Sequence, residues 1–311
     1  MRPLTEQVAV DGGSLTVHRL TQAPDGAPVV VALHSISSNA LAWVPVARRL
    51  DGLVHVLAPD MRGRAESSHL RSAGLADHVA DVHALLVHFG VTRPVLAGHD
   101  MGAFVAALAA ATHPEDVGAV VLVDGGLAFP SPGSLFNAIA DVDEVLHSII
   151  GPAMDRLSMT FDDDAAYLAH WGVHPTLGPH LDGASGPALA AYLLHDLAGP
   201  RGQMRSTSSL ESVRADWADL VSDPATLSAV HTMQCSATLL YAGRGPLGQP
   251  EGLYTADRIA AAHLPPDVTV RGLDSDHYGV LLDPASVAAV ADALTVSAGP
   301  PSGRGIHTSV R

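Results

Sequence analysis

The sequence predicts an α/β protein built on a mostly parallel sheet with helices on both faces. Three observations predict it. Short apolar runs rich in β-branched residues alternate with helical patterns, the alternation stops after Gly126, and it resumes beyond about residue 230. A helical insertion into such a sheet indicates a cap over one end of it.

The elements follow in a regular order. Residues 8–10 and 15–20, joined by Asp-Gly-Gly-Ser, predict an opening hairpin. Four buried strands are expected at 29–33, 54–58, 95–97 and 120–123, with helices at about 40–50, 75–89 and 101–112. After the insertion, strands at 238–242 and 268–273 alternate with helices at 254–263 and 284–294.

This pattern divides the chain into four parts. Residues 1–126 form the first part of the core, 127–230 the helical cap, and 231–296 the second part of the core. The Gly- and Pro-rich tail at 297–311 is expected to be disordered.

The composition excludes several classes of function. The chain has 311 residues, is 47% hydrophobic and carries a net charge of -15 without a basic run, which argues against nucleic-acid and anionic-membrane partners. Every cationic residue is an arginine, so a Schiff-base lysine and a P-loop lysine are excluded. With Cys235 as its one cysteine, the chain has no intrachain disulfide and no thiolate metal cluster.

No segment has the pattern of a signal peptide or of a membrane span. The stretch 1–10 lacks an apolar core, and no run of about 18 uncharged apolar residues occurs. We therefore expect a cytoplasmic protein whose partner is a small-molecule substrate, and a homodimer is left open.

The most informative motif is Gly98-His99-Asp100-Met101-Gly102, between an apolar run and an Ala-rich run. It has the form glycine-x-nucleophile-x-glycine that turns a strand sharply into a helix and exposes the central side chain. That side chain is most often serine, and here it is aspartate. Three further polar groups follow predicted strands: His34-Ser35-Ile36, Asp124 and His277.

These features resemble the α/β-hydrolase superfamily over about residues 5–295. The resemblance rests on the Asp100 turn, on His34-Ser35 where that family has His-Gly, and on the segment 59–67, which is similar to its D-x-R-G-x-G-x-S pattern. It implies the α/β-hydrolase fold, with about eight strands and a cap inserted after the sixth. Aspartate after Gly-His is similar to the epoxide hydrolase and haloalkane dehalogenase branch, whereas the flanking sequence looks more like esterases.

The resemblance also implies roles. Asp100 attacks an electrophilic carbon and forms an alkyl-enzyme ester, and His277 activates the water that hydrolyses it. The backbone N–H groups of Ile36 and Met101 form the oxyanion hole. The acid that orients His277 is expected to be Asp124, with Glu251 as the alternative, because the loop after residue 242 has no aspartate where many relatives carry one.

Four residues are candidates for contacts with substrate: His34, Trp171, Tyr167 and Tyr192. His34 is expected mainly to brace its loop. Trp171 is a candidate halide donor, and the two tyrosines are candidate proton donors to an epoxide oxygen. No cofactor is needed, and the histidines lack a zinc-binding H-E-x-x-H, so no metal is expected.

The leading hypothesis is therefore epoxide hydrolysis on a mid-sized, apolar substrate. The alternatives are a haloalkane dehalogenase, a non-hydrolytic cofactor-free lyase or cyclase, and a ligand-binding protein on the same scaffold.

Overall fold

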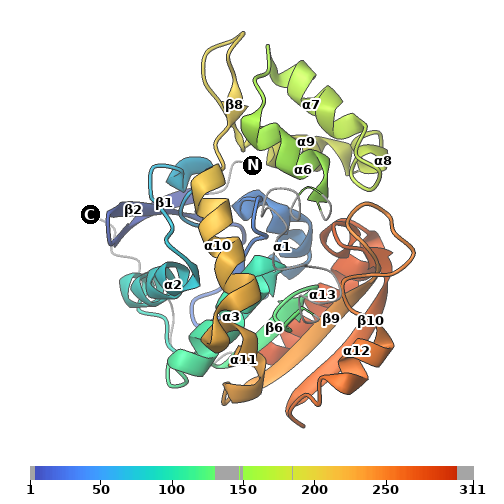
Figure 1. Cartoon of the computed structure of the whole chain (residues 1–311). Helices are drawn as coiled ribbons and strands as arrows, with labels where there is room; N and C mark the ends of the chain where they lie inside the picture. The colour runs from blue at the N-terminus through green and yellow to red at the C-terminus, as the bar shows by residue number, and fades with distance from the viewer. Residues whose placement is uncertain (1–3, 130–146, 148–149, 184, 300–311) are drawn as a thin grey trace.

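The computed structural model describes residues 4–129, 147, 150–183 and 185–299. Its centre is an eight-stranded sheet in the order β1-β2-β4-β3-β5-β6-β9-β10. Strands β1 and β2 pair antiparallel, as does β2 with β4, and the pairings from β4 through β10 are parallel. The predicted fold class is confirmed: a mostly parallel sheet flanked by helices (Figure 1).

The strands of the sheet are β1 Leu4–Val10, β2 Gly13–Arg19, β3 Val29–Leu33, β4 His55–Pro59, β5 Val95–His99, β6 Ala119–Val123, β9 Ser236–Arg244 and β10 Val268–Asp276. The helices of the core are α1 Val44–Leu50, α2 Leu75–Phe89, α3 Met101–Thr112, α10 Leu210–Ser222, α11 Pro224–Thr232, α12 Ala256–Ala261 and α13 Pro284–Ala298, with 3-10 turns η1 Ala40–Trp43, η2 Ala65–Ser67 and η4 Gly279–Leu281.

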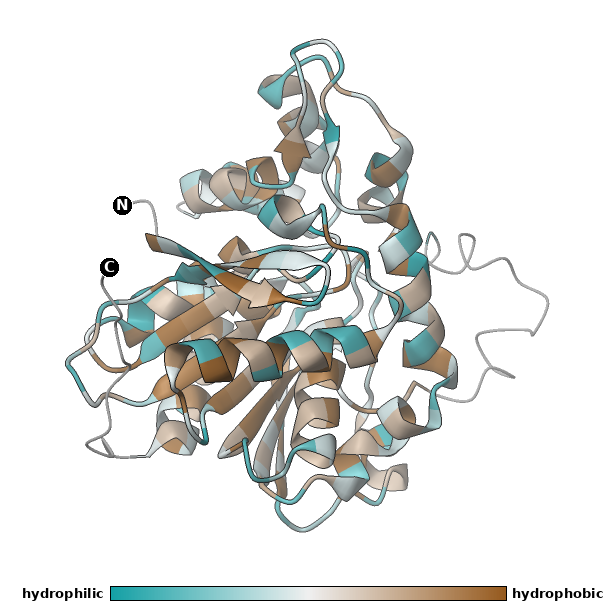
Figure 2. Cartoon of the chain, turned by 90° about the vertical axis from the view of Figure 1, so that its left-hand side faces the viewer, coloured by the Kyte–Doolittle hydropathy of each residue, from teal (hydrophilic) through white to brown (hydrophobic). Residues whose placement is uncertain are grey.

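Alternation along each strand divides the core into two layers. On β3, Val31 and Leu33 pack with α2, α3 and α11, whereas Val30 and Ala32 pack with α1 and α13 on the opposite face. Both faces of the central strands are therefore apolar, as expected for a parallel sheet buried between helices. Figure 2 shows the same layering, with brown strands between helices whose teal sides face outward.

Helix α3 is apolar on every side because it is surrounded. All residues from Met101 to Ala110 are buried, and the helix contacts β5, β6, α2 and α11. An apolar helix without a polar face is typical of such a fully enclosed position. It supports the turn that carries Asp100 at the helix N-terminus.

The elements from α6 to β8, between β6 and β9 in the sequence, lie above one end of the sheet (Figure 1), and we name this segment the cap. Its elements are α6 Pro152–Asp155, η3 Arg156–Ser158, α7 Asp164–Gly172, α8 Gly178–Leu181, α9 Gly186–Leu194, β7 Leu197–Ala198 and β8 Arg205–Ser206. The last two form a small antiparallel pair that the sequence pattern did not indicate, because two-residue strands carry no periodicity.

Two further differences from the expected elements occur among the described residues. The helix expected at about 40–50 divides into η1 and α1, where Pro45 stands in the first turn of α1. Helices α10 and α11, expected in the cap, pack against α2 and α3. Residues 300–311 of the tail and 130–146, 148–149 and 184 of the expected cap lie outside the described residues.

In the described part of the chain, every helix is too short or too polar to cross a bilayer.

Candidate active site

Asp100 stands at a strained corner between β5 and α3. Its backbone has φ 52° and ψ −119°, a conformation rare for a residue other than glycine. Its neighbours must be small: a Cβ added at Gly98 would lie 2.1 Å from the carbonyl oxygen of Gly102, and one at Gly125 would lie 2.2 Å from that of Asp100. The glycines therefore allow the tight turn and the close approach of the next loop.

One oxygen of the Asp100 carboxylate is held by two donors. The Ser35 hydroxyl donates to Oδ2 at 2.7 Å and the backbone N–H of Ile36 donates to the same atom at 3.1 Å. The other oxygen, Oδ1, makes no hydrogen bond to any described residue, and the residue is 8% exposed. The carboxylate thus has one anchored oxygen and one that can attack.

The imidazole of His277 contacts the carboxylate of Asp124. His277, after β10, and Asp124, after β6, meet through a 2.7 Å contact between Nδ1 and Oδ2. The other carboxylate oxygen accepts the backbone N–H of Ala242 on β9 at 2.9 Å. Asp124 also has a positive φ, 45°, which turns its side chain at the strand end. Glu251, the alternative acid, is exposed.

The charges around His277 stabilise the positive charge that the imidazole gains when it takes up a proton. Burial lowers the pKa of this imidazole, but the hydrogen bond to Asp124 and the charges of Asp124 and Asp100 outweigh burial and raise the pKa above the ordinary histidine value. Asp100 is therefore close enough to act on His277 electrostatically. An imidazole oriented at Nδ1 by a carboxylate has Nε2 available as a general base.

His99 and His34 surround this centre as neutral side chains. Burial lowers the pKa of each to about 3. The Nε2–H group of His99 donates to the His277 carbonyl at 2.9 Å and its ring lies 4.6 Å from the His277 ring. Both ring nitrogens of His34 make hydrogen bonds to backbone groups. Nδ1 donates to the Ser35 carbonyl at 2.8 Å, and Nε2 accepts from the Met61 N–H at 2.9 Å.

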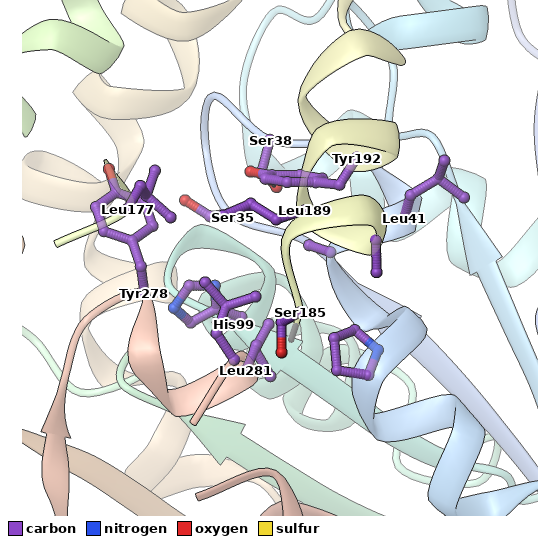
Figure 3. A pocket seen from close by; sticks show the side chains of 14 residues that line it. Ser35, Ser38, Leu41, His99, Leu177, Ser185, Leu189, Tyr192, Tyr278 and Leu281 are labelled. Atoms are coloured by element: carbon purple, nitrogen blue, oxygen red, sulfur yellow. Dashed lines mark hydrogen bonds between the residues drawn. The ribbon is translucent and has the colours of Figure 1, made fainter. Parts of the chain in front are cut away.

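A pocket with about 480 Å³ of empty space, part of it open to solvent, lies beside this centre (Figure 3). The cavity is lined by Ser35, which donates to Asp100, and by His99, the residue before Asp100. Asp100 and His277 themselves are not among the lining residues. Its polar lining consists of Ser35, Ser38, His99, Ser185, Tyr192 and Tyr278, and its apolar lining of Leu41, Ala42, Pro45, Leu177, Ala188, Leu189, Leu281 and Leu282. With His99 neutral, the described lining carries no charged group, which favours an uncharged, largely apolar ligand.

The structure separates the four candidate contacts. Tyr192 lines the cavity, and its hydroxyl lies 2.9 Å from the Ser38 hydroxyl. Tyr167 faces the interior of the cap, where its hydroxyl donates to Asp196 at 2.6 Å. Trp171 is buried in the cap, outside the cavity lining, and His34 is occupied as described above.

Sequence reasoning missed two groups at the site. The sequence assigns no role to the Ser35 side chain, yet its hydroxyl donates to Asp100, and Tyr278 lines the cavity with its ring centroid 5.1 Å from that of His277. Met101 of the expected oxyanion hole is fully buried at the start of α3. The position of Tyr278 beside His277 in the sequence was the one available signal.

Of the two clusters of possible metal ligands among the described residues, the more buried one joins His18, Asp60 and His195. The Nε2 atoms of His18 and His195 lie 2.9 and 2.8 Å from Oδ2 of Asp60, and the three possible ligand atoms lie within 4.8 Å of one another. His18 Nδ1 is buried and has no hydrogen-bond partner among the residues that the structure describes. A metal ion bound to Nε2 of His18 would leave the N–H group at Nδ1 of the same ring buried and unpaired. A histidine that binds a metal normally donates this second N–H to a carboxylate, a carbonyl or a water. The cluster therefore fits a hydrogen-bonded link between sheet and cap better than a metal centre.

Comparison with known proteins agrees with the fold. The family model described as alpha/beta hydrolase fold matches residues 28–147. Lipase LipV of Mycobacterium tuberculosis is 27% identical over 280 residues, which cover 89% of this chain and 96% of that protein. Epoxide hydrolase 4 of Mus musculus is 29% identical over 128 residues, 40% of this chain but only 34% of that protein.

A solved structure matches nearly the whole chain. The crystal structure of E-2-(acetamidomethylene)succinate hydrolase superposes with a TM-score of 0.74 at 20% identity, and covers 94% of this chain and 99% of its own. Together with the strand order, these matches show that the chain has the α/β-hydrolase fold.

Proposed function

We propose that this protein is a hydrolase with Asp100 as its nucleophile, and that its substrate is an epoxide on an uncharged, mid-sized, apolar molecule. The observation that carries the proposal is the Asp100 carboxylate, anchored at Oδ2 by Ser35 and Ile36. A carboxylate is ionised at neutral pH and needs no base to activate it. Its corner lies beside a cavity whose described lining residues carry no charged group.

In the first step, Oδ1 of Asp100 attacks an epoxide carbon and the carbon–oxygen bond of the ring breaks. The electron pair goes to the epoxide oxygen, which takes a proton from the Tyr192 hydroxyl. Tyr192 has this role because it is the cap tyrosine that lines the cavity. The product of the step is an ester between Asp100 and the opened substrate.

In the second step, Nε2 of His277 takes a proton from water, and the water oxygen attacks Cγ of Asp100. Negative charge develops on Oδ2, where the Ser35 hydroxyl and the Ile36 N–H already donate. The bond between Cγ and Oδ1 then breaks, and the proton that remained on the attacking water oxygen passes to the departing alkoxide, which releases the diol and restores the Asp100 carboxylate. The proton on His277 returns to Tyr192, so the net reaction is epoxide plus water to diol.

The dehalogenase alternative has less support. A departing halide needs N–H donors in the cavity, and Trp171, the candidate donor, does not line it. The lyase and ligand-binding alternatives are separated by the experiment that follows.

The test is a single turnover in ¹⁸O-labelled water, with styrene oxide and a panel of uncharged aryl and alkyl epoxides. The label is expected in the peptide that contains Asp100 and not in the first diol formed. His277→Gln should accumulate the ester, seen as an added substrate mass on the intact protein, and Asp100→Asn should form none. Label in the diol alone, or turnover by Asp100→Asn, would refute the nucleophile. Absence of an adduct with every epoxide would refute the substrate class.

A further inference from the structure

Two buried arginines hold successive carbonyl groups of the loop that binds Asp100. We name residues 35–38 the oxyanion loop, because Ser35 and Ile36 donate to the nucleophile there. The guanidinium of Arg64 donates from Nε to the Ile36 carbonyl at 2.9 Å, and that of Arg156 donates from Nη2 to the Ser37 carbonyl.

Arg64 reaches the loop from the core. It is fully buried, pairs with Asp216 on α10 at 2.6 Å, and also donates to the Arg62 carbonyl at 2.8 Å. Its Nη2 lies 3.9 Å from the sulfur of Met101, the residue after the nucleophile. A single side chain thus contacts the oxyanion loop and the start of α3.

Arg156 reaches the loop from the cap. It is 1% exposed, pairs with Asp196 at 3.0 Å, and lies 5.1 Å above the ring of Trp171. Asp196 is itself held by the hydroxyl groups of Tyr167, Ser206, Thr207 and Ser208. Residues of the cap therefore hold the Arg156 guanidinium in place, and from this position it donates to the oxyanion loop of the core.

Buried ion pairs such as Arg64–Asp216 and Arg156–Asp196 add little to stability, because the cost of removing both charges from water offsets most of their attraction. Their planar, multiply donating guanidinium groups are well suited to fixing direction. We infer that Arg64 and Arg156 are positioning residues that orient the oxyanion loop from the core and the cap, so that catalysis depends on a docked cap. This inference rests on the proposed Asp100 chemistry.

The expected effect differs between the two chemical steps. In the first step Asp100 loses charge, so donors to Oδ2 stabilise the starting carboxylate and their loosening should not slow attack. In the second step Oδ2 becomes an oxyanion, and loss of one donor typically slows such a step about 10²–10³-fold. A loosened oxyanion loop should therefore accumulate the ester.

The test compares Arg64→Lys and Arg156→Lys, which keep the charge but lose the planar fork, with Arg201→Lys on the cap surface, where the arginine side chain is 84% exposed. Rapid-quench mass spectrometry of the full chain with styrene oxide measures ester formation and ester hydrolysis separately, and hydrogen exchange measures protection of the peptide containing the oxyanion loop. We expect at least tenfold slower hydrolysis, unchanged ester formation and faster amide exchange in the two buried variants alone.

His277→Gln separates the possible failures. If it forms no ester, the proposed chemistry is wrong. If it forms the ester while both buried variants keep wild-type hydrolysis, or lose both steps equally, the positioning role is wrong. Should Arg64→Lys fail to fold, Arg156→Lys decides the question, since its arginine lies in the cap.

Discussion

The contact between His277 and Asp124 makes a strong prediction about Asp124→Asn. The Ala242 N–H donates to Oδ1 at 2.9 Å, so it should keep the amide oxygen of the new side chain in that place. Rotation of the amide would leave the buried N–H of Ala242 unpaired, which would cost roughly 1–3 kcal/mol. The amide NH2 group would then face Nδ1 of His277, 2.7 Å away in the wild type.

That arrangement forces the wrong tautomer on His277. Nδ1 must accept, so the proton moves to Nε2, the atom that should take a proton from water. A comparable substitution in a serine protease triad lowers kcat about 10⁴-fold, and at about 1.36 kcal/mol per decade this is about 5 kcal/mol of transition-state stabilisation. Ester formation by Asp100 does not use this base and should change by less than about tenfold.

The assay is again rapid quench with an epoxide, which resolves the two steps. The matched control is Asp274→Asn on β10, the strand that ends just before His277, where the carboxylate side chain is 97% exposed and pairs with Arg244. Hydrolysis by Asp124→Asn within tenfold of the wild type would refute the role of Asp124. An equal loss in both steps would instead indicate that the substitution disturbs the Asp100 turn.

Three further predictions follow from other contacts. Tyr192→Phe should slow ester formation about 10²–10⁴-fold in stopped-flow assays, whereas Tyr167→Phe, which removes a hydrogen bond inside the cap, should lower Tm with little effect on that rate. The pKa of His195 is lowered by burial but raised further by Asp60, so the net shift is upward. Its contribution to stability should be complete below pH 6.5 and should disappear as pH rises through the raised pKa; a Tm difference between wild type and His195→Gln that grows with pH would contradict this. Gly125→Ala should destabilise the fold by about 1–3 kcal/mol in urea and abolish turnover, whereas Gly172→Ala, with open space around the new methyl group, should do neither.

Much of the core could be predicted because its signals are local. Strand β3 and helices α2 and α3 lie where the apolar patterns place them. Periodicity and breaker residues are properties of neighbouring residues, so a linear chain displays them. The two-residue strands of the cap and the packing of α10 and α11 on the core depend on distant partners, which periodicity does not record.

The candidate site likewise has features that the sequence predicts and features that depend on tertiary structure. Glycine spacing pointed to the Asp100 turn, because a tight turn requires small residues at fixed positions. Spacing leaves both Asp124 and Glu251 open as the acid, whereas the structure places the Asp124 carboxylate against His277 and leaves Glu251 exposed. Tyr167 and Tyr192 could not be told apart by spacing, since their directions depend on how the cap packs.

The amino-acid sequence by itself determined the alternation of strands and helices, the aspartate at the corner and the absence of lysine, because these depend only on residue identity and near neighbours. Tertiary structure decided which carboxylate contacts His277, which tyrosine faces the cavity, and that two buried arginines hold the oxyanion loop. These features depend on side chains brought together from distant parts of the chain, where packing and the pairing of buried charges select the partners.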